Sequence, residues 1–379
     1  MNIKNCIFLI LYIFSNYAFG QPTPISGNLN GITKEALNTN PYLGVIIIDK
    51  NTDLNRAYIL NEIKKDFRLY IELDSIPKEF NKFDFSNITG ITIECSENLK
   101  DITNLKYFEN LKKLSVNNFK GKYLSKENIP LRMLKFFSIS NSPNLISLES
   151  IFHLENLERI ILNDLPKFSE YTEDFKHLKK VDSLSLTKLN IEKIPDFFPT
   201  NLSFLYIQEP SPSRRKLKNI QNLKLYKNLK DLRLTGMDID VGKPDLYNLR
   251  LENLFLELNY YTQKFDFIFS FGEIKNLRLE TLHSYVYSKN DMCITKITNI
   301  YLESMINLND INSFFECDEN SIEKITVRHT GIKTLPDLSK LTNIPILLIE
   351  YNRQLMQSDT TISENWKIQK NGIYFNEKE

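Results

Sequence analysis

One spacing of apolar residues recurs along most of this chain. An apolar residue is followed three positions later by a second, and two positions after that by a third, as in Leu111, Leu114 and Val116. The two-residue step is the spacing of side chains on one face of a β-strand. Between copies the apolar residues fall three apart, which is the repeat of a 3-10 helix. Each copy therefore predicts a short strand followed by a 3-10 or irregular segment.

The pattern occurs twelve times between residues 88 and 349, about 23 residues apart, and a weaker copy precedes them at Ile71/Leu73. One such unit cannot bury its own apolar positions, so stacked units must share a continuous core. A period in the twenties with this pattern is typical of leucine-rich repeats. We therefore predict an α/β solenoid, a leucine-rich repeat horseshoe of about 12–13 repeats with a parallel β-sheet on its concave side and a 3-10 or irregular convex side. The twelve copies are Ile88/Ile91/Ile93, Leu111/Leu114/Val116, Leu134/Phe137/Ile139, Leu157/Ile160/Leu162, Val181/Leu184/Leu186, Leu202/Leu205/Ile207, Leu229/Leu232/Leu234, Leu251/Leu254/Leu256, Ile274/Leu277/Leu279, Ile297/Ile300/Leu302, Ile322/Ile325/Val327 and Ile344/Leu347/Ile349.

Two stretches show the pattern most fully, residues 98–116 (NLKDITNLKYFENLKKLSV) and residues 331–349 (GIKTLPDLSKLTNIPILLI). They resemble the internalin-type leucine-rich repeats of bacteria, and the resemblance covers roughly residues 68–355. It implies a nearly helical convex segment after each strand and an Asn eight positions after the first core residue. Asn259 and Asn352 hold this place in two repeats. Apolar residues fill it elsewhere, namely Phe119, Leu165, Leu189, Leu282 and Met305.

The first twenty residues read as a secretory signal peptide. Lys4 precedes an apolar run at residues 6–14 (CIFLILYIF), and the small residues Ala18 and Gly20 lie before an expected cut that leaves Gln21 first. A membrane anchor is the alternative, but the run is shorter than the roughly 20 residues that span a bilayer. We therefore expect a secreted, periplasmic or cell-envelope protein with no membrane span.

The remaining segments divide into caps and repeats. Residues 21–67 are expected to form a linker, up to about residue 41, and an N-terminal cap with a strand at 42–49 and a helix at 52–67. The repeats are assigned to residues 68–355. Residues 356–379 are expected to form a C-terminal cap, because Asn371-Gly372 joins two short alternating runs as in a β-hairpin.

The cysteines that remain after the expected cleavage are odd in number, whereas an oxidising compartment favours cysteines paired in disulfides. Cys6 lies in the signal segment, which leaves Cys95, Cys293 and Cys317. Cys293 and Cys317 fall at nearly the same phase of successive repeats, so we predict a disulfide between them. Two unpaired small core residues are the alternative. Cys95 then remains single.

Charge and chemistry argue against several function classes. Lys and Arg number 48 and Asp and Glu number 47, so no basic excess points to nucleic acid. The four histidines do not pair at metal-ligand spacing, and no phosphate-binding or nucleophile motif is present. We therefore predict a protein that is not an enzyme and has no catalytic residue, cofactor or metal.

The residue between the last two apolar positions of each copy should face solvent on the concave side. Read in order, these residues form a column whose first half is mostly small, with Thr92, Ser115, Ser138, Ile161 and Ser185. The second half alternates aromatic residues and arginine, with Tyr206, Arg233, Phe255, Arg278 and Tyr301. A neighbouring column contains Glu257, Glu280 and Glu303.

Tyr, Phe and Arg are enriched at binding hot spots, so we predict that these eight residues bind a partner. In the alternative, the residues satisfy one another through cation–π contacts and ion pairs from Arg278 to Glu257 and Glu303. Calcium between the three carboxylates is a further alternative. Residues 209–219 (EPSPSRRKLKN) form either a solvated insertion or a contact loop.

These observations predict an exported, non-catalytic leucine-rich repeat protein that binds a macromolecule through its concave face. The internalin resemblance implies that a protein partner is favoured over a glycan, which stays possible. A self-associating envelope scaffold is the alternative function, and the sequence leaves the oligomeric state open.

Overall fold

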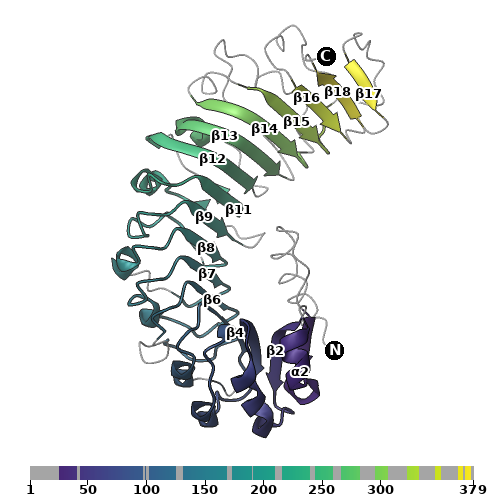
Figure 1. The fold of residues 1–379 in the computed structure, drawn as a ribbon. Coiled ribbons are helices and arrows are strands. Elements are labelled where there is room, and N and C mark those ends of the chain that lie inside the picture. Colours follow the sequence, from purple (N-terminus) through teal and green to yellow (C-terminus); the bar gives the residue numbers. More distant parts are fainter. Residues whose placement is uncertain are drawn as a thin grey trace. The chain divides into compact units, whose positions relative to one another are not determined.

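The computed structural model divides into two compact units. Figure 1 shows their strands and helices, coloured along the sequence. The first unit comprises Met1–Glu158 and Asp164–Glu170, and the second comprises Arg159–Asn163 and Tyr171–Glu379. The structure describes residues 25–40, 43–96, 99, 102–124, 131–168, 173–189, 191–209, 216–239, 244–258, 266–281, 295–305, 322–332, 346–350, 366–369 and 372–376.

The first unit is a ladder of parallel strands separated by short helical turns. The turns are almost all 3-10 helices, and one six-residue α-helix stands near the beginning. The strands are β1 (Ile25–Asn28), β2 (Leu43–Asp49), β3 (Phe67–Glu72), β4 (Ile88–Glu94), β5 (Lys113–Asn117) and β6 (Phe136–Ser140). The helices are η1 (Leu29–Gly31), α2 (Lys34–Thr39), η2 (Leu54–Glu62), η3 (Lys78–Lys82), η4 (Thr103–Tyr107) and η6 (Glu149–Ile151).

The second unit continues the same pattern and ends in an antiparallel hairpin. The parallel strands are β7 (Arg159–Asn163), β8 (Ser183–Thr187), β9 (Phe204–Gln208), β10 (Lys216–Leu217), β11 (Asp231–Ile239), β12 (Leu246–Leu258), β13 (Phe271–Thr281), β14 (Lys296–Glu303), β15 (Lys324–Arg328) and β16 (Ile346–Glu350). The hairpin consists of β17 (Trp366–Gln369) and β18 (Gly372–Asn376). The 3-10 helices are η7 (Glu173–His177), η8 (Gln221–Leu225) and η9 (Asp266–Ser270).

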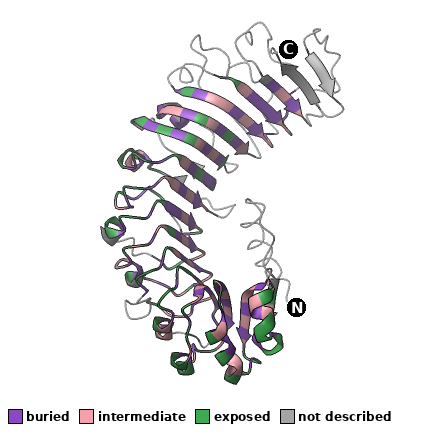
Figure 2. Cartoon of the chain, in the orientation of Figure 1, coloured by how far each residue is buried: buried purple, intermediate pink, exposed green. Residues whose placement is uncertain are grey.

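The repeat that contains η4 and β5 shows how the mixed apolar spacing folds. Within it, the N–H groups of Leu105, Phe108 and Leu111 each donate to the carbonyl three residues earlier, at 3.0, 3.0 and 3.1 Å. The three-residue spacing therefore follows a 3-10 turn, and these side chains are fully buried. Leu114 and Val116 on β5 are also fully buried, while Lys113 is exposed and Ser115 is half-buried. Figure 2 shows buried and less buried residues along the strands. The predicted leucine-rich repeat solenoid, with parallel strands and 3-10 turns, is confirmed.

The residue two positions after the last core residue of many repeats adopts a left-handed backbone. Its φ lies between 50° and 58° at six non-glycine positions, and Gly236 takes the same place with φ 70°. The chain turns there into the core, and the next residue is buried after each of the six: it is apolar in four repeats, as Phe119, Leu165, Leu189 and Met305, and polar in two, as Ser142 and Thr330. In those four repeats an apolar side chain fills the position where the internalin resemblance implied Asn. The six left-handed residues are Asn118, Asn141, Asp164, Lys188, Ser304 and His329.

Asparagine has a different role, immediately before the first core residue of a repeat. There its side-chain amide donates to a main-chain carbonyl of the preceding repeat, which joins successive turns. The Asn110 amide reaches the Ser86 carbonyl at 3.0 Å, and the Asn156 amide reaches the Arg132 carbonyl at 2.9 Å. Asn87 and Asn201 make the equivalent bonds to Ile63 and Lys179.

The N-terminal segment differs from the prediction in three ways. Residues 25–40, expected to be linker, form β1, η1 and α2, because Leu29 and Leu37 are fully buried and tie the segment to the core. The core pair of β3 is Leu69/Ile71 rather than Ile71/Leu73, since Leu69 pairs with Ile46 and Ile91. The helix expected at 52–67 is the shorter 3-10 helix η2.

That helix begins at Leu54, two residues after the start of the predicted range. Its cap is Asp53, whose carboxylate accepts from the Asn55 N–H at 3.0 Å. Its preceding strand β2 already pairs with β3 in the repeat register, so the ladder of strands begins before residue 68.

The predicted C-terminal hairpin is present. β17 and β18 pair antiparallel, and β18 also pairs along β16, so that it covers the last parallel strand. Other predictions lie outside the described residues: the signal peptide at 1–20, the Cys293–Cys317 disulfide, Asn259, Leu282 and Asn352, and residues 210–215 of the loop. Among the helices that the structure describes, none combines the length and apolarity needed to cross a bilayer.

Candidate binding face

The strands of the second unit present one side to the buried core and the other to solvent. We call the solvent side of β9 and β11–β16 the open face. The strand register places Tyr206, Arg233, Phe255, Arg278 and Tyr301 as successive partners on this face, which confirms the predicted order. We call these five residues the aromatic–arginine column. Parallel strands lie about 4.8 Å apart, so the column places an aromatic or guanidinium group at each step.

Two further columns flank the aromatic–arginine column. Toward the strand ends the register aligns Gln208, Thr235, Glu257, Glu280 and Glu303, which we call the acidic column. Toward the strand starts it aligns Phe204, Asp231, Asn253, Asn276 and Asn299. The sequence reading did not include this third column, although the same two-residue alternation places it on the open face.

Arg278 contacts one aromatic ring and two carboxylates of the open face. Its guanidinium carbon lies 5.1 Å from the centre of the Phe255 ring. The same guanidinium pairs with Glu303 at 2.7 Å and approaches Glu280 at 3.5 Å. The expected pair with Glu257 is not among the ion pairs of the described residues, where Glu280 on the same strand takes that place. These exposed contacts are individually weak, about 0–1 kcal/mol each.

Arg233 and Tyr206 of the column also contact neighbouring side chains. The Arg233 guanidinium lies 5.4 Å from the Phe204 ring, and not over either aromatic neighbour in its own column. The Tyr206 hydroxyl donates to Gln208 Oε1 at 2.9 Å and accepts from Thr235 Oγ1 at 3.4 Å. The column is therefore partly self-satisfied, as the alternative reading expected, and its polar groups are held in place before any partner arrives.

The acidic column is electrostatically strained at Glu280. Burial raises the pKa of this carboxyl above its usual range, Glu303 and Glu257 raise it further, and Arg278 opposes the shift. Among the residues that the structure describes, no three His, Cys, Asp or Glu side chains are grouped so that they could hold a metal ion. The positive charge beside Glu280 and Glu303 is supplied by Arg278.

The third column contains a ladder of side-chain amides. Asn299 Nδ2 donates to Asn276 Oδ1 at 2.8 Å, and Asn276 Nδ2 donates to Asn253 Oδ1 at 2.9 Å. Asn253 Nδ2 in turn donates to the carboxylate of Asp231. All three amides thus point the same way along the sheet, and the ladder ties β11 to β14 in one register.

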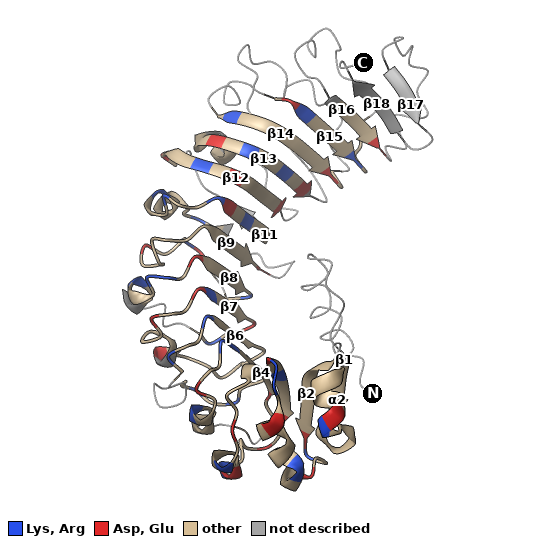
Figure 3. Ribbon diagram, viewed as in Figure 1, with Lys and Arg blue, Asp and Glu red and all other residues tan. Residues whose placement is uncertain are grey.

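The open face extends beyond the predicted residues onto β15 and β16. The register continues the aromatic–arginine column to Thr326 and Leu348, and the acidic column to Arg328 and Glu350. Figure 3 shows basic and acidic residues side by side on these strands. The signal was present in the sequence, because the copies at Ile322/Ile325/Val327 and Ile344/Leu347/Ile349 enclose Thr326 and Leu348 in the same way.

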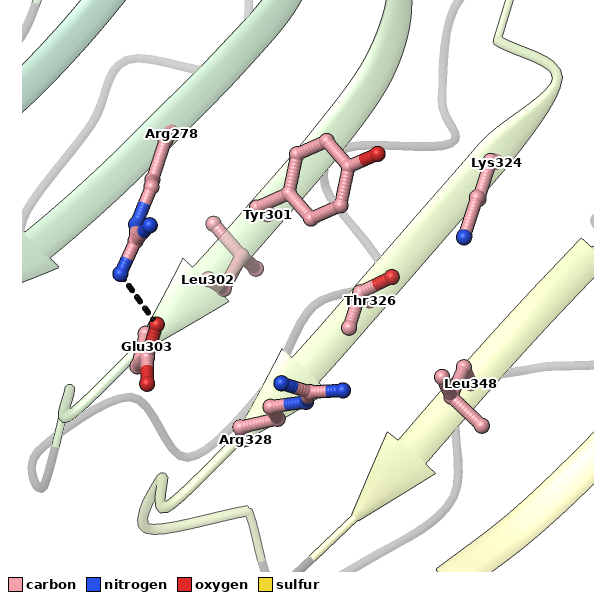
Figure 4. Close-up of a pocket in the computed structure, with 8 residues that line it drawn as sticks. All are labelled: Arg278, Tyr301, Leu302, Glu303, Lys324, Thr326, Arg328 and Leu348. Carbon is pink, nitrogen blue, oxygen red and sulfur yellow. Dashed lines mark hydrogen bonds and ion pairs between the residues drawn. The ribbon is translucent and has the colours of Figure 1, made fainter. Parts of the chain in front are cut away.

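A pocket of about 230 Å³ opens on this extension (Figure 4). Side chains from β13, β14, β15 and β16 surround it, and it contains both charged and apolar walls. Arg278 and Glu303 of the predicted patch form one side and pair with each other. The lining residues are Arg278, Tyr301, Leu302, Glu303, Lys324, Thr326, Arg328 and Leu348.

The first unit presents mostly small side chains at the positions that correspond to the aromatic–arginine column. Thr92, Ser115 and Ser138 align as the sequence predicted. Beside them Glu94 accepts hydrogen bonds from the amides of Asn117, at 3.2 Å, and Asn118. Burial raises the pKa of Glu94 despite these bonds. Tyr70 on β3 is in register with Thr92, so this column begins with one aromatic residue and continues with small ones.

Comparison with known proteins supports the fold. No protein-family model matches the chain, and no curated protein matches its sequence. A leucine-rich repeat protein of Leptospira interrogans superposes with a TM-score of 0.51 at 16% identity, covering 87% of this chain and 88% of that one. TLR13, solved in a complex with ssRNA13, gives the same TM-score and identity over 87% of this chain and 58% of that one. At this identity the likeness shows the leucine-rich repeat fold.

Proposed function

We propose that this chain is an exported, non-catalytic leucine-rich repeat protein that binds a protein partner through its open face. The observation that carries the proposal is the aromatic–arginine column, in which five successive strands each present Tyr, Phe or Arg. These residue types dominate binding hot spots. Cation–π contacts and ion pairs surround these residues, and a partner's side chains can make the same kinds of contact.

The strand register supports rigid presentation. Because each side chain of the column is held by its strand and by a contact with a neighbouring polar, charged or aromatic side chain, little conformational entropy is lost when a partner docks. The half-buried rings of Tyr206, Phe255 and Tyr301 offer apolar area, and the acidic column beside them offers charge complementarity. The internalin resemblance favours a protein over a glycan.

A double substitution tests the open face. Phe255→Ala combined with Arg278→Ala removes both the Phe255 ring and the guanidinium that lies over it. We expect the variant to keep its circular dichroism spectrum and to lose the proteins that the parent chain retains from extracellular or host material. The matched control is Lys230→Ala with Glu252→Ala, an exposed ion pair outside the three columns. Equal retention by the double variant would refute the proposal, and retention of only further copies of the chain would favour the scaffold alternative.

Export rests on residues 1–20 and has its own test. A reporter fused after residue 25 should leave the cytoplasm, and its N-terminus should begin at Gln21. A reporter that stays inside, or retains residues 1–20, would refute export without affecting the binding proposal.

A further inference from the structure

The pocket on β13–β16 contains a buried hydroxyl with no hydrogen-bond partner. Thr326 is 5% exposed, and its Oγ1 has no partner among the residues that the structure describes. Buried polar atoms are normally satisfied, because an unsatisfied one costs about 1–3 kcal/mol. Thr326 is also one of the residues that line the pocket, which places its side chain beside any group that enters.

Of the three cations that line the pocket, two form ion pairs in the part of the chain that the structure describes, and Lys324 does not. Arg278 pairs with Glu303 at 2.7 Å, and Arg328 pairs with Glu350. Lys324 has no ion-pair partner within the described residues, and its amino group lies 5.8 Å from the centre of the Tyr301 ring. A single unpaired ammonium matches a single negative charge. A doubly charged group would meet the carboxylate of Glu303 in the same lining.

The remaining walls are apolar and the space is small. Tyr301 and Leu348 flank Thr326 from the neighbouring strands (Figure 4). The volume of about 230 Å³ lies below the roughly 300–1,000 Å³ of small-molecule sites. It has room for a side chain with an apolar stem and a polar end.

We infer that this pocket binds the carboxylate of an Asp or Glu side chain from an acidic segment of a protein partner. The carboxylate accepts from Thr326 Oγ1 and pairs with Lys324, while its methylene stem packs on Tyr301 and Leu348. The inference rests on the proposed function, because Arg278, Tyr301 and Glu303 belong to both, and it names the chemistry of the partner. It also explains why a threonine with no partner is kept buried at this point of the face.

The test uses the full chain and two blocked tripeptides, triglutamate and triglutamine, with methyl NMR of Thr326 and Leu348 as the readout. Triglutamate should shift both methyl signals, and triglutamine should not. Thr326→Val and Lys324→Met should each weaken triglutamate binding by about tenfold or more, the size expected for losing a hydrogen bond or ion pair to a charged group. Inorganic phosphate and free sialic acid are run beside the peptides.

Thr295→Val is the matched control. Thr295 is also a buried threonine of the second unit and belongs to none of the three columns, but its hydroxyl donates to the Phe271 carbonyl at 2.8 Å. It should leave triglutamate binding unchanged and lower the melting temperature. Thr326→Val should not lower the melting temperature, because its hydroxyl has no bond to lose, so loss of binding cannot be attributed to misfolding.

The outcomes separate the two proposals. Equal binding of triglutamine, binding of phosphate or sialic acid in preference to triglutamate, or unchanged affinity in Thr326→Val would overturn the carboxylate pocket. If Thr326→Val retains the full set of partner proteins while Phe255→Ala with Arg278→Ala loses them, the pocket inference is wrong and the proposed function stands. If triglutamate binds as expected but the double variant retains every protein, the proposed function is wrong instead.

Discussion

Asn276→Ala should destabilise the sheet beneath the open face more than substitution at the end of the same amide ladder. Asn276 makes three hydrogen bonds: its Nδ2 donates to Asn253 Oδ1 at 2.9 Å and to the Glu252 carbonyl at 3.1 Å, and its Oδ1 accepts from Asn299 at 2.8 Å. Asn299 contributes only the last of these to the ladder. The two substitutions are otherwise alike in size and in position on the strand.

The magnitude follows from the bond count. A hydrogen bond contributes a net 0.5–1.5 kcal/mol, about 1 kcal/mol on average. Because the ladder is half-buried and water can replace part of each lost bond, we expect Asn276→Ala to cost about 1.5–3 kcal/mol. Asn299→Ala should cost about 0.5–1.5 kcal/mol on the same basis. Lys275→Ala, at an exposed neighbour on β13, should cost almost nothing.

Hydrogen exchange is the suitable assay, because stability in stacked repeats is carried by contacts between neighbours. Peptides that span β12 and β13 should exchange at least about tenfold faster in Asn276→Ala, since about 1.4 kcal/mol corresponds to a factor of ten. Asn299→Ala should show a smaller change centred on β13 and β14. Exchange in Asn276→Ala that equals the parent, or that is slower than in Asn299→Ala, would refute the reasoning.

Three further substitutions or treatments have defined outcomes. Gly272→Ala should lower the melting temperature sharply, because a Cβ there would lie 2.1 Å from the Tyr247 carbonyl oxygen, whereas Gly31→Ala, where a Cβ meets nothing within 4 Å, should change it little. Glu280→Gln should be more stable than the parent at pH 7. Burial holds the pKa of Glu280 above its usual range, so the ionised carboxylate destabilises the fold as pH rises through that value. The gain should disappear below about pH 4, where the parent is protonated in both states, and a gain that persists in acid would contradict this cause. Cys95 should resist alkylation at pH 8 in the folded chain and react in urea, as judged by peptide mapping, because burial raises the pKa of its thiol to about 12.

The sequence predicted the fold because the repeat pattern is itself the packing rule. Leu114 and Val116 must share a face of a strand, and Leu105, Phe108 and Leu111 must share a face of a 3-10 turn, whatever the details around them. The same rule placed Tyr206 through Tyr301 in register, since each residue enclosed by two core positions has to point to the opposite side.

The N-terminal prediction was wrong where the pattern is weak. Leu43, Ile46 and Ile48 have the repeat spacing and are buried on β2, but the single copy is hidden in a continuous apolar run. At β3 the run offers two registers, Leu69/Ile71 and Ile71/Leu73. The pairing with Ile91 and Ile93 on β4 decides between them, and that is tertiary information.

Other features depend on contacts that spacing does not encode. Glu209 was assigned to a polar loop, yet it is 2% exposed and its Oε1 accepts from the N–H groups of Leu189 and Ile191, both at 3.2 Å. The pocket beside Thr326 likewise depends on which way Lys324 and the two arginines turn. The column could be read from the sequence, whereas the unsatisfied hydroxyl could be found only in the structure.

The central claim is that the open face contacts a partner, and site-specific photocrosslinking tests it most directly. A benzophenone side chain at Phe255 should form a covalent product with a macromolecule in extracellular or host material, and excess unlabelled parent chain should compete it away. The same group at Tyr58, which is 57% exposed on η2, should give no such product. A product from Tyr58 and none from Phe255 would contradict the account.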